Sequence, residues 1–252
     1  YCVYRDFDDG LSLEKNEVER FPAAHVKDLV KSSITDWGRG LRLTEDDFFA
    51  TLFTKGGFTA GHANFGNVIA NLINQNTDNL AYDAKPAFTR SGNERTSKGG
   101  GTYFNAISGS PLNVTNYATL HDRIFISNAY NARDERINTK SMGTVALILP
   151  PQLRDEAVRT VESEYLPGTD QNDKNPWFKS AKLVEWDALR DNAATWYLMV
   201  LKKGVSFYRA GKPEIRMFRD EDSGAYKATV RALYGFMFWN FRILGGADVP
   251  TS

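Results

Sequence analysis

The feature that most constrains this chain is an apolar stripe of helical period that runs for about 30 residues after Pro22. Its members recur at steps of three, four or seven residues: Val26, Val30, Ile34, Trp37, Leu41, Phe48 and Leu52. Residues spaced in this way lie on one face of an α-helix. At 1.5 Å per residue such a helix is on the order of 45 Å long. It therefore needs an equally long apolar surface to pack against.

Glycines interrupt this helical pattern and also bound it. Pro22 suits the first turn of a helix, and Gly56–Gly57 suits its end. Gly38 and Gly40 lie in the middle, where each costs roughly 1 kcal/mol relative to alanine. We therefore expect a bend or break at these glycines, with Thr44 of "LTEDDF" capping a second helical segment.

The rest of the chain predicts an α+β fold. Residues 4–22 mix charge with turn residues and suit an extended arm or loop, and "FGNVIANLINQ" predicts a short helix. Helical spacing also marks "NVTNYATLHDRIFISNAYNA" and "QLRDEAVRTVESEY", while the apolar run in "GTVALILPP" is typical of a strand buried on both faces. Further strands are predicted in "AKLVEWDAL", "TWYLMVL", "VSFYRA" and the aromatic stretch "AYKATVRALYGFMFWNFRIL".

Composition excludes several classes of function. The chain has 31 basic and 31 acidic residues, so it lacks the positive charge expected of a dedicated duplex-binding protein. Its single cysteine, Cys2, can form neither an internal disulfide nor a zinc site with a second thiol, which is typical of a reducing compartment. No apolar run approaches the roughly 20 residues that a membrane-spanning helix requires, so we expect no membrane association.

The segment "RTSKGGGTYFN" superficially resembles a phosphate-binding loop. A P-loop, however, places its lysine after the glycines and opens directly into a helix. Here Lys98 precedes the glycines, and no helical pattern follows Thr102. We interpret the tract as a flexible surface loop with no role in nucleotide binding.

The residues that carry enzyme chemistry form no recognisable set. The three histidines, His25, His62 and His121, lack the spacing of a metal site, and the acidic clusters lack the alternation of a calcium loop. The abundant tryptophans, tyrosines and phenylalanines lie within strand patterns, where core and subunit-interface packing explain them. We therefore expect no catalytic residues, no cofactor and no metal.

Several segments, taken in order, resemble the major capsid proteins of tailed bacteriophages, particularly the Mu-like major head subunit branch. An apolar–Asp–x–x–Pro segment runs into a glycine-rich loop closed by an aromatic residue and asparagine. A buried strand ending in proline follows, then two strands around a polar turn, then an Arg–x–x–Tyr–Gly strand. The matching segments are Tyr82–Phe88, Gly99–Asn105, Val145–Val158, Leu183–Val200 and Arg231–Arg242. In "FWNFR" the chain departs from the family, which often has Asp before Trp-Arg.

This resemblance covers about residues 22–245 and implies an HK97-like capsid fold with peripheral and axial domains. The implied division gives an N-terminal arm or extended loop at residues 1–21 and a peripheral domain with a long spine helix at residues 22–111. The axial domain then occupies residues 112–210, and residues 211–252 return to the peripheral domain. The spine helix corresponds to the segment from Pro22 to about Lys55.

The resemblance also implies partners. They are copies of the chain itself in pentamers and hexamers of an icosahedral shell, with scaffold, portal or decoration proteins and packaged double-stranded DNA contacted without sequence specificity. The implied location is the virion, with assembly in the host cytoplasm. An encapsulin-like shell of the same fold stays open as an alternative, as does an α/β enzyme with an unrecognised site.

The resemblance further suggests how subunits hold together. Some members of the family form a lysine–asparagine isopeptide bond between subunits, and Lys15 lies in the segment that would supply the lysine. No matching set of residues accompanies it, so we expect non-covalent cohesion. In this hypothesis the arm reaches across neighbouring subunits and buries Tyr4, Phe7 and Leu11 against them.

Overall fold

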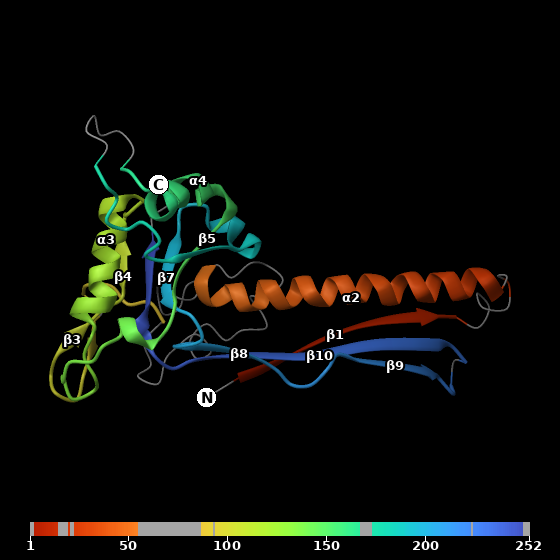
Figure 1. Ribbon diagram of the computed structural model, residues 1–252. Helices are drawn as coiled ribbons and strands as arrows, with labels where there is room; N and C mark the ends of the chain where they lie inside the picture. Colours follow the sequence, from red (N-terminus) through yellow and green to blue (C-terminus); the bar gives the residue numbers. More distant parts are fainter. Residues whose placement is uncertain are drawn as a thin grey trace. The chain divides into compact units, whose positions relative to one another are not determined.

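The computed structural model describes residues 3–14, 20, 23–54, 87–92, 94–166, 173–222 and 224–248. The chain divides into two compact units. Unit 1 comprises Tyr1–Phe49 and Phe207–Phe236, and unit 2 comprises Ala50–Ser206 and Met237–Ser252. Figure 1 shows the elements of each unit, which are described separately below.

Unit 1 is a long helix packed along an antiparallel sheet. Helix α2 (Ala23–Thr54) runs beside strands β1 (Val3–Leu13) and β10 (Tyr226–Phe238), as Figure 1 shows. Strand β1 pairs with β10 along its whole length, from Val3 opposite Phe236 to Leu13 opposite Tyr226. Strands β8 (Val205–Arg209) and β9 (Glu214–Arg219) complete the sheet by pairing with β10.

The core of unit 1 is aromatic. Alternate side chains of β1 and β10 point to the same face of the sheet because the side-chain period of a strand is two. These side chains meet the helix in a cluster of rings whose centroids lie 4.5–6.0 Å apart, made by Phe7, Phe48, Phe49, Phe207, Tyr234 and Phe236. The sheet thus supplies the long apolar surface that the stripe of α2 requires.

The predicted long helix is confirmed, but the predicted break is wrong. Helix α2 is continuous through Gly38, Gly40 and Thr44. A side chain added at either glycine would have no atom within 4 Å in the described residues. Both glycines therefore lie on the open side of the helix, while the opposite side is held against the sheet. Trp37 is only half-buried, and the short helix predicted at residues 65–75 lies outside the described residues.

Unit 2 is built on a mixed five-stranded sheet with the order β4, β11, β7, β5, β6. Its strands are β4 (Ala106–Ser108), β5 (Val145–Leu149), β6 (Lys182–Glu185), β7 (Trp196–Val200) and β11 (Leu244–Asp248). All residues of β5 and β7 are buried. This confirms the buried strand expected in "GTVALILPP" and the strands expected at β6 and β7.

Short helices cover one face of this sheet. Helix α3 (Val114–Asp122) continues into a π-helical turn, η1 (Arg123–Ser127). A second helical segment combines η3 (Pro151–Leu153), α4 (Arg154–Ala157) and η4 (Val158–Glu162). Both lie where helical spacing was predicted. The core between these helices and the sheet contains Leu112, Tyr117, Leu120, Ile124, Val145, Leu147, Leu149, Ala157, Val161, Trp196, Leu198 and Ala247.

The remaining described elements of unit 2 are short. A two-stranded hairpin is formed by β2 (Arg95–Thr96) and β3 (Thr102–Tyr103) around the glycine tract. Three 3-10 turns, η2 (Lys140–Met142), η5 (Asp187–Asn192) and η6 (Phe241–Ile243), connect the larger elements. Phe53, Phe88 and Tyr197 pack ring against ring, and the hydroxyl of Tyr197 donates a hydrogen bond to the backbone oxygen of Phe53.

Asn105 joins three separate segments inside unit 2. Its side chain is fully buried, and its Oδ1 accepts a hydrogen bond from the Thr89 amide at 2.8 Å. Its Nδ2 donates to the backbone oxygens of Ala87 at 3.0 Å and Leu244 at 2.9 Å. The backbone oxygen of Phe241 also accepts from this Nδ2, at 3.3 Å. A buried amide with every polar group engaged specifies its surroundings closely, because any displacement leaves polar groups unpaired.

We predict that Asn105→Ala destabilises the protein by at least about 3 kcal/mol. The substitution leaves the Thr89 amide and two buried carbonyl oxygens without this partner, at roughly 1–3 kcal/mol each. Urea unfolding measures the loss. Asn116→Ala is the control, since Asn116 donates an exposed hydrogen bond to Pro111 at 2.8 Å and should cost under about 1 kcal/mol. Equal stability of the two variants would contradict the role given to Asn105.

Candidate functional site

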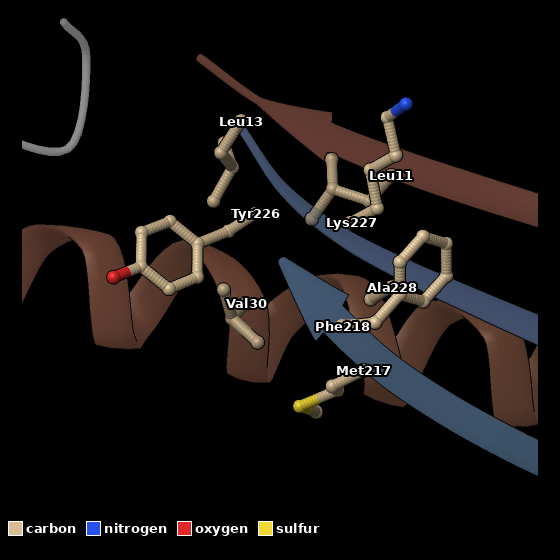
Figure 2. A pocket seen from close by; sticks show the side chains of 8 residues that line it. All are labelled: Leu11, Leu13, Val30, Met217, Phe218, Tyr226, Lys227 and Ala228. Carbon is tan, nitrogen blue, oxygen red and sulfur yellow. The ribbon is translucent and has the colours of Figure 1, made fainter. Parts of the chain in front are cut away.

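The described residues of unit 1 form an open apolar pocket. Its volume is about 190 Å³. Figure 2 shows side chains from β1, α2, β9 and β10 converging on it. The residues that line it are Leu11, Leu13, Val30, Met217, Phe218, Tyr226, Lys227 and Ala228.

The pocket is open because the aromatic filling of unit 1 is uneven. Around Phe7 and Phe48 the space between helix and sheet is closed by rings. Towards the end of β1 the side chains that β1 and α2 contribute to the pocket are aliphatic (Leu11, Leu13 and Val30), and the space beside them is open. Apolar side chains beside the pocket are largely exposed: Ile215 by 44%, Met217 by 61%, Phe218 by 49% and Tyr226 by 47%. Exposed apolar groups gathered in one place are typical of a surface that contacts another molecule.

Charged residues make contacts at the tip of the β9–β10 hairpin, which forms one wall of the pocket. Lys227 forms an ion pair with Asp220 at the turn between β9 and β10. The guanidinium of Arg219 lies 5.5 Å from the centre of the Tyr226 ring and donates to the oxygen of Gly224 at 3.3 Å. These contacts hold the β9–β10 hairpin closed at its tip. The pocket could accept an apolar side chain, but it offers no set of groups for catalysis.

The four interface residues predicted from the sequence fall in different places. Phe7 is buried in its own unit, 5.4 Å from the ring of Phe48 and 5.5 Å from that of Tyr234. Leu11 is half-buried and lines the pocket. Tyr4 is paired in β1 opposite Gly235, but its side chain lies outside the described residues, as does all of Lys15. The role of Tyr4, Leu11 and Lys15 in subunit contacts stays a prediction, whereas the ring of Phe7 is already packed within its own unit.

A buried carboxylate lies in the second half of helix α2. The side chain of Glu45 is only 11% exposed. It accepts a hydrogen bond from Nε of Arg209 at 2.5 Å, and this pairing raises the pKa of Arg209. The ion pair ties the helix to β8. It explains why a charged residue is tolerated beside the aromatic core, since a buried charge is stable only when it is paired.

The glycine tract in unit 2 lies at the surface, as expected from the sequence, and forms a hydrogen-bonded turn around a carboxylate of its own chain. Asp134 accepts hydrogen bonds from the amide of Gly101 at 3.0 Å and the hydroxyl of Tyr103 at 2.7 Å. A Cβ atom at Gly101 would lie 2.8 Å from Oδ1 of Asp134, and Gly100 has a φ of 97°. Glycine is needed here for both close approach and backbone conformation.

These contacts shift the pKa values of both partners. Hydrogen bonds from Ser97, Tyr103 and the Gly101 amide lower the pKa of Asp134. Burial, followed by the hydrogen bond to Asp134, raises the pKa of Tyr103 to about 12. The shifts favour an ionised Asp134 and a neutral Tyr103 at neutral pH. The loop thus binds an anion as a phosphate loop does, but the anion is internal.

The described part of the chain contains no group of three or more histidine, cysteine, aspartate or glutamate side chains that could hold a metal ion. His121 lies among aromatic rings, with its ring centre 4.6 Å from that of Phe125 and 4.7 Å from that of Trp177. Its Nδ1 is 3.3 Å from Oδ1 of Asp122. This histidine is part of the packing of unit 2, while the side chains of His25 and His62 lie outside the described residues.

Sequence reasoning missed the strand that forms one wall of the pocket. The segment "EIRMFR" of β9 has all six residues exposed, so it lacks the apolar–polar alternation by which a half-buried strand is found. The only available signals were its content of Ile, Met and Phe and the turn residues that follow it. Strand β11, rich in small residues, was missed for the same lack of pattern.

Comparison with solved structures identifies the fold. The mature capsid of bacteriophage PhiM1 aligns with a TM-score of 0.52 at 10% identity, covering 98% of this chain and 71% of that one. The capsid of Ralstonia phage GP4 aligns with a TM-score of 0.50 at 11% identity, covering 98% and 73%. The chain has the HK97-like fold. An encapsulin of Synechococcus elongatus also aligns, with a TM-score of 0.49 at 9% identity, covering 98% and 74%.

The fold is thus similar to that of phage capsid subunits at very low sequence identity. No protein-family model and no curated protein matches the sequence. Among the described residues, none of the helices is long and apolar enough to cross a membrane. The HK97-like fold expected from the ordered motifs is confirmed.

We predict that the stabilising effect of the Asp134 carboxylate is lost at acidic pH. Because its pKa is lower in the fold than the ordinary value of 3.8, the carboxylate stabilises the fold fully above that value. The effect disappears as pH falls through the lowered pKa. Asp134→Asn should therefore be less stable than the wild type at pH 7 and approach it below about pH 4.

Urea unfolding of both proteins across this pH range measures the difference. Asp191→Asn, which changes an exposed aspartate at the end of η5, is the control and should differ little from the wild type throughout. A wild-type advantage over Asp134→Asn that does not change between pH 7 and pH 3 would contradict the assignment.

Proposed function

We propose that this protein is the major capsid protein of a tailed bacteriophage, which assembles into the icosahedral shell around the phage genome. The observation that carries the proposal is the HK97-like fold, which aligns over 98% of the chain with the capsids of PhiM1 and Ralstonia phage GP4. The role is structural, and we assign no catalytic residue and no cofactor.

The physical features of the chain support a shell subunit. Its formal net charge of zero avoids long-range repulsion among many copies in contact. Unit 1 exposes a group of apolar side chains at the pocket, as expected of a surface that becomes covered on assembly. Neither the described polar clusters nor the pocket offers a nucleophile, a base and an orienting group together.

Within this proposal the elements take the roles implied by the sequence resemblance. Helix α2 is the spine helix of the peripheral domain, and the segment before it is the arm or extended loop. Residues 112–210, with β5, β6 and β7, form the axial domain, and residues 211–252 return to the peripheral domain. The ordered motifs further favour the Mu-like major head subunit branch, although "FWNFR" departs from its usual sequence.

The proposed partners follow from the same role. Copies of the chain form pentamers and hexamers, and they meet scaffold, portal or decoration proteins during assembly in the host cytoplasm. The finished shell is part of the virion and contacts double-stranded DNA without sequence specificity. Cohesion between subunits is non-covalent, with contributions from Tyr4 and Leu11, and Lys15 forms no isopeptide bond.

We predict that the expressed protein, alone or with its scaffold, forms closed icosahedral particles. Cryo-electron microscopy of the purified protein tests this. A protein that stays monomeric under all assembly conditions would contradict the proposal. The neighbouring genes separate the two shell classes, because a capsid protein is encoded near terminase, portal and protease genes, whereas an encapsulin is encoded near its cargo protein.

We also predict that the particles contain no covalent links between subunits. Particles boiled in denaturant and separated by electrophoresis should give a single band at the mass of one chain. Particles of the Lys15→Arg variant, which cannot form an isopeptide bond at this position, serve as the control and should give the same pattern. A ladder of multimers in the wild type that is absent from Lys15→Arg would show that Lys15 is chemically engaged.

A further inference from the structure

The sheet of unit 1 has two unlike edges. Residues 226–231 of β10 pair with both β1 and β9. Since a strand has one partner on each side, β1 and β9 lie on opposite sides of β10. Neither has a second partner strand among the described residues. Each therefore presents unpaired backbone N–H and C=O groups along its outer edge, which can accept a strand from another molecule.

Strand β9 is an exposed edge with apolar character. All six of its residues are exposed, including Ile215, Met217 and Phe218 at 44%, 61% and 49%. A regular edge strand with several apolar side chains pairs readily with other strands unless something prevents it. The pocket lies beside this strand, so a partner strand at the edge would also shield its apolar wall from water.

The two edges carry opposite charge. Strand β1 contains three aspartates and one arginine, whereas β9 contains two arginines and one glutamate, with Lys212 just before it. On β1, Asp6 is held by Nε of Arg231 at 2.7 Å, but Asp8 and Asp9 are exposed. On β9, Arg216 is exposed, and it forms an ion pair with Glu214 of the same strand at 3.0 Å.

This distribution selects the pairing. Two β1 edges would bring aspartates together, and two β9 edges would bring basic residues together, so like edges repel. A β1 edge and a β9 edge attract. Charged side chains commonly protect a sheet edge from pairing with other strands. Here the two edges of one sheet carry charges of opposite sign, so charge does not prevent a β1 edge from pairing with a β9 edge.

We propose that strand β9 of one copy pairs with strand β1 of a second copy, so that the sheet of unit 1 continues from one subunit to the next. The contact is head-to-tail, because it uses different surfaces on the two copies. Repeated contacts of this kind close into rings when the rotation between copies permits. The proposal rests on the proposed shell function and names a surface by which the copies meet.

Charge exchange tests the pairing. The first variant reverses the basic edge with Lys212→Glu and Arg216→Glu, and the second reverses the acidic edge with Asp8→Lys and Asp9→Lys. A third variant carries all four substitutions. We expect each single-edge variant to have a critical concentration for particle formation at least tenfold above that of the wild type. In the variant with all four substitutions, the critical concentration should return to within about threefold of the wild-type value.

Arg190→Glu is the matched control, because Arg190 is an exposed arginine of unit 2 that pairs with Asp187 three residues away. It should assemble like the wild type. Circular dichroism of the unassembled proteins checks that each variant folds. If the wild type forms shells and both single-edge variants form them at the same concentration, the edge pairing is overturned while the shell function stands.

A disulfide trap tests the contact without requiring shells. In a Cys2→Ser background, one protein carries Asp8→Cys and another carries Arg216→Cys. On mild oxidation, an equimolar mixture of these two proteins should give a disulfide-linked dimer of the two. Its yield should be at least tenfold higher than the yield of mixed dimer from the control mixture of Asp8→Cys and Asp191→Cys. If the wild type forms no shells, the proposed function fails, but the yield of disulfide-linked dimer still tests the edge pairing. Equal dimer yields in the two mixtures would overturn the edge pairing.

Discussion

The structure of unit 2 depends on the buried amide of Asn105. Its Oδ1 and Nδ2 contact the backbone on both sides of Phe88 and at Leu244, segments that are far apart in the sequence. The backbone next to Asn105 is held in the same place. The amide of Gly246 donates to the backbone oxygen of Asn105 at 3.0 Å, and β4 pairs with β11 from Ala106 onward. One polar side chain thereby sets the position of the edge strand of the main sheet.

Some of this fold could be predicted from the sequence and some could not, for physical reasons. Helix α2 was predictable because its contacts repeat along one face, so burial leaves a periodic trace. Strand β5 was predictable because both of its faces are buried. The partners of Asn105 were not, because a hydrogen bond to a backbone oxygen imposes no requirement on the residue type that supplies it.

The candidate site likewise contains residues that the sequence singled out and residues that it did not. Leu11 was predicted to be buried against a neighbouring subunit, which stays a prediction, and within its own unit it lines the pocket. Met217 and Phe218 were missed because exposure on both faces of β9 leaves no alternation. The turn around Asp134 was missed because its two halves come from separate parts of the sequence, and a glycine tract does not reveal which side chain approaches it.

The register of β1 has a consequence for the order of events during synthesis. Val3 pairs with Phe236 and Leu13 with Tyr226, so β1 cannot pair until β10, far later in the sequence, has been made. In unit 2, β4 and β7 likewise pair with β11 at residues 244–248. Such long-range pairing is slow, because a large loop must close before any contact rewards it. Both sheets are therefore completed only after the ribosome has made β10 and β11, and a nascent chain that lacks these strands cannot present finished sheet edges to its neighbours.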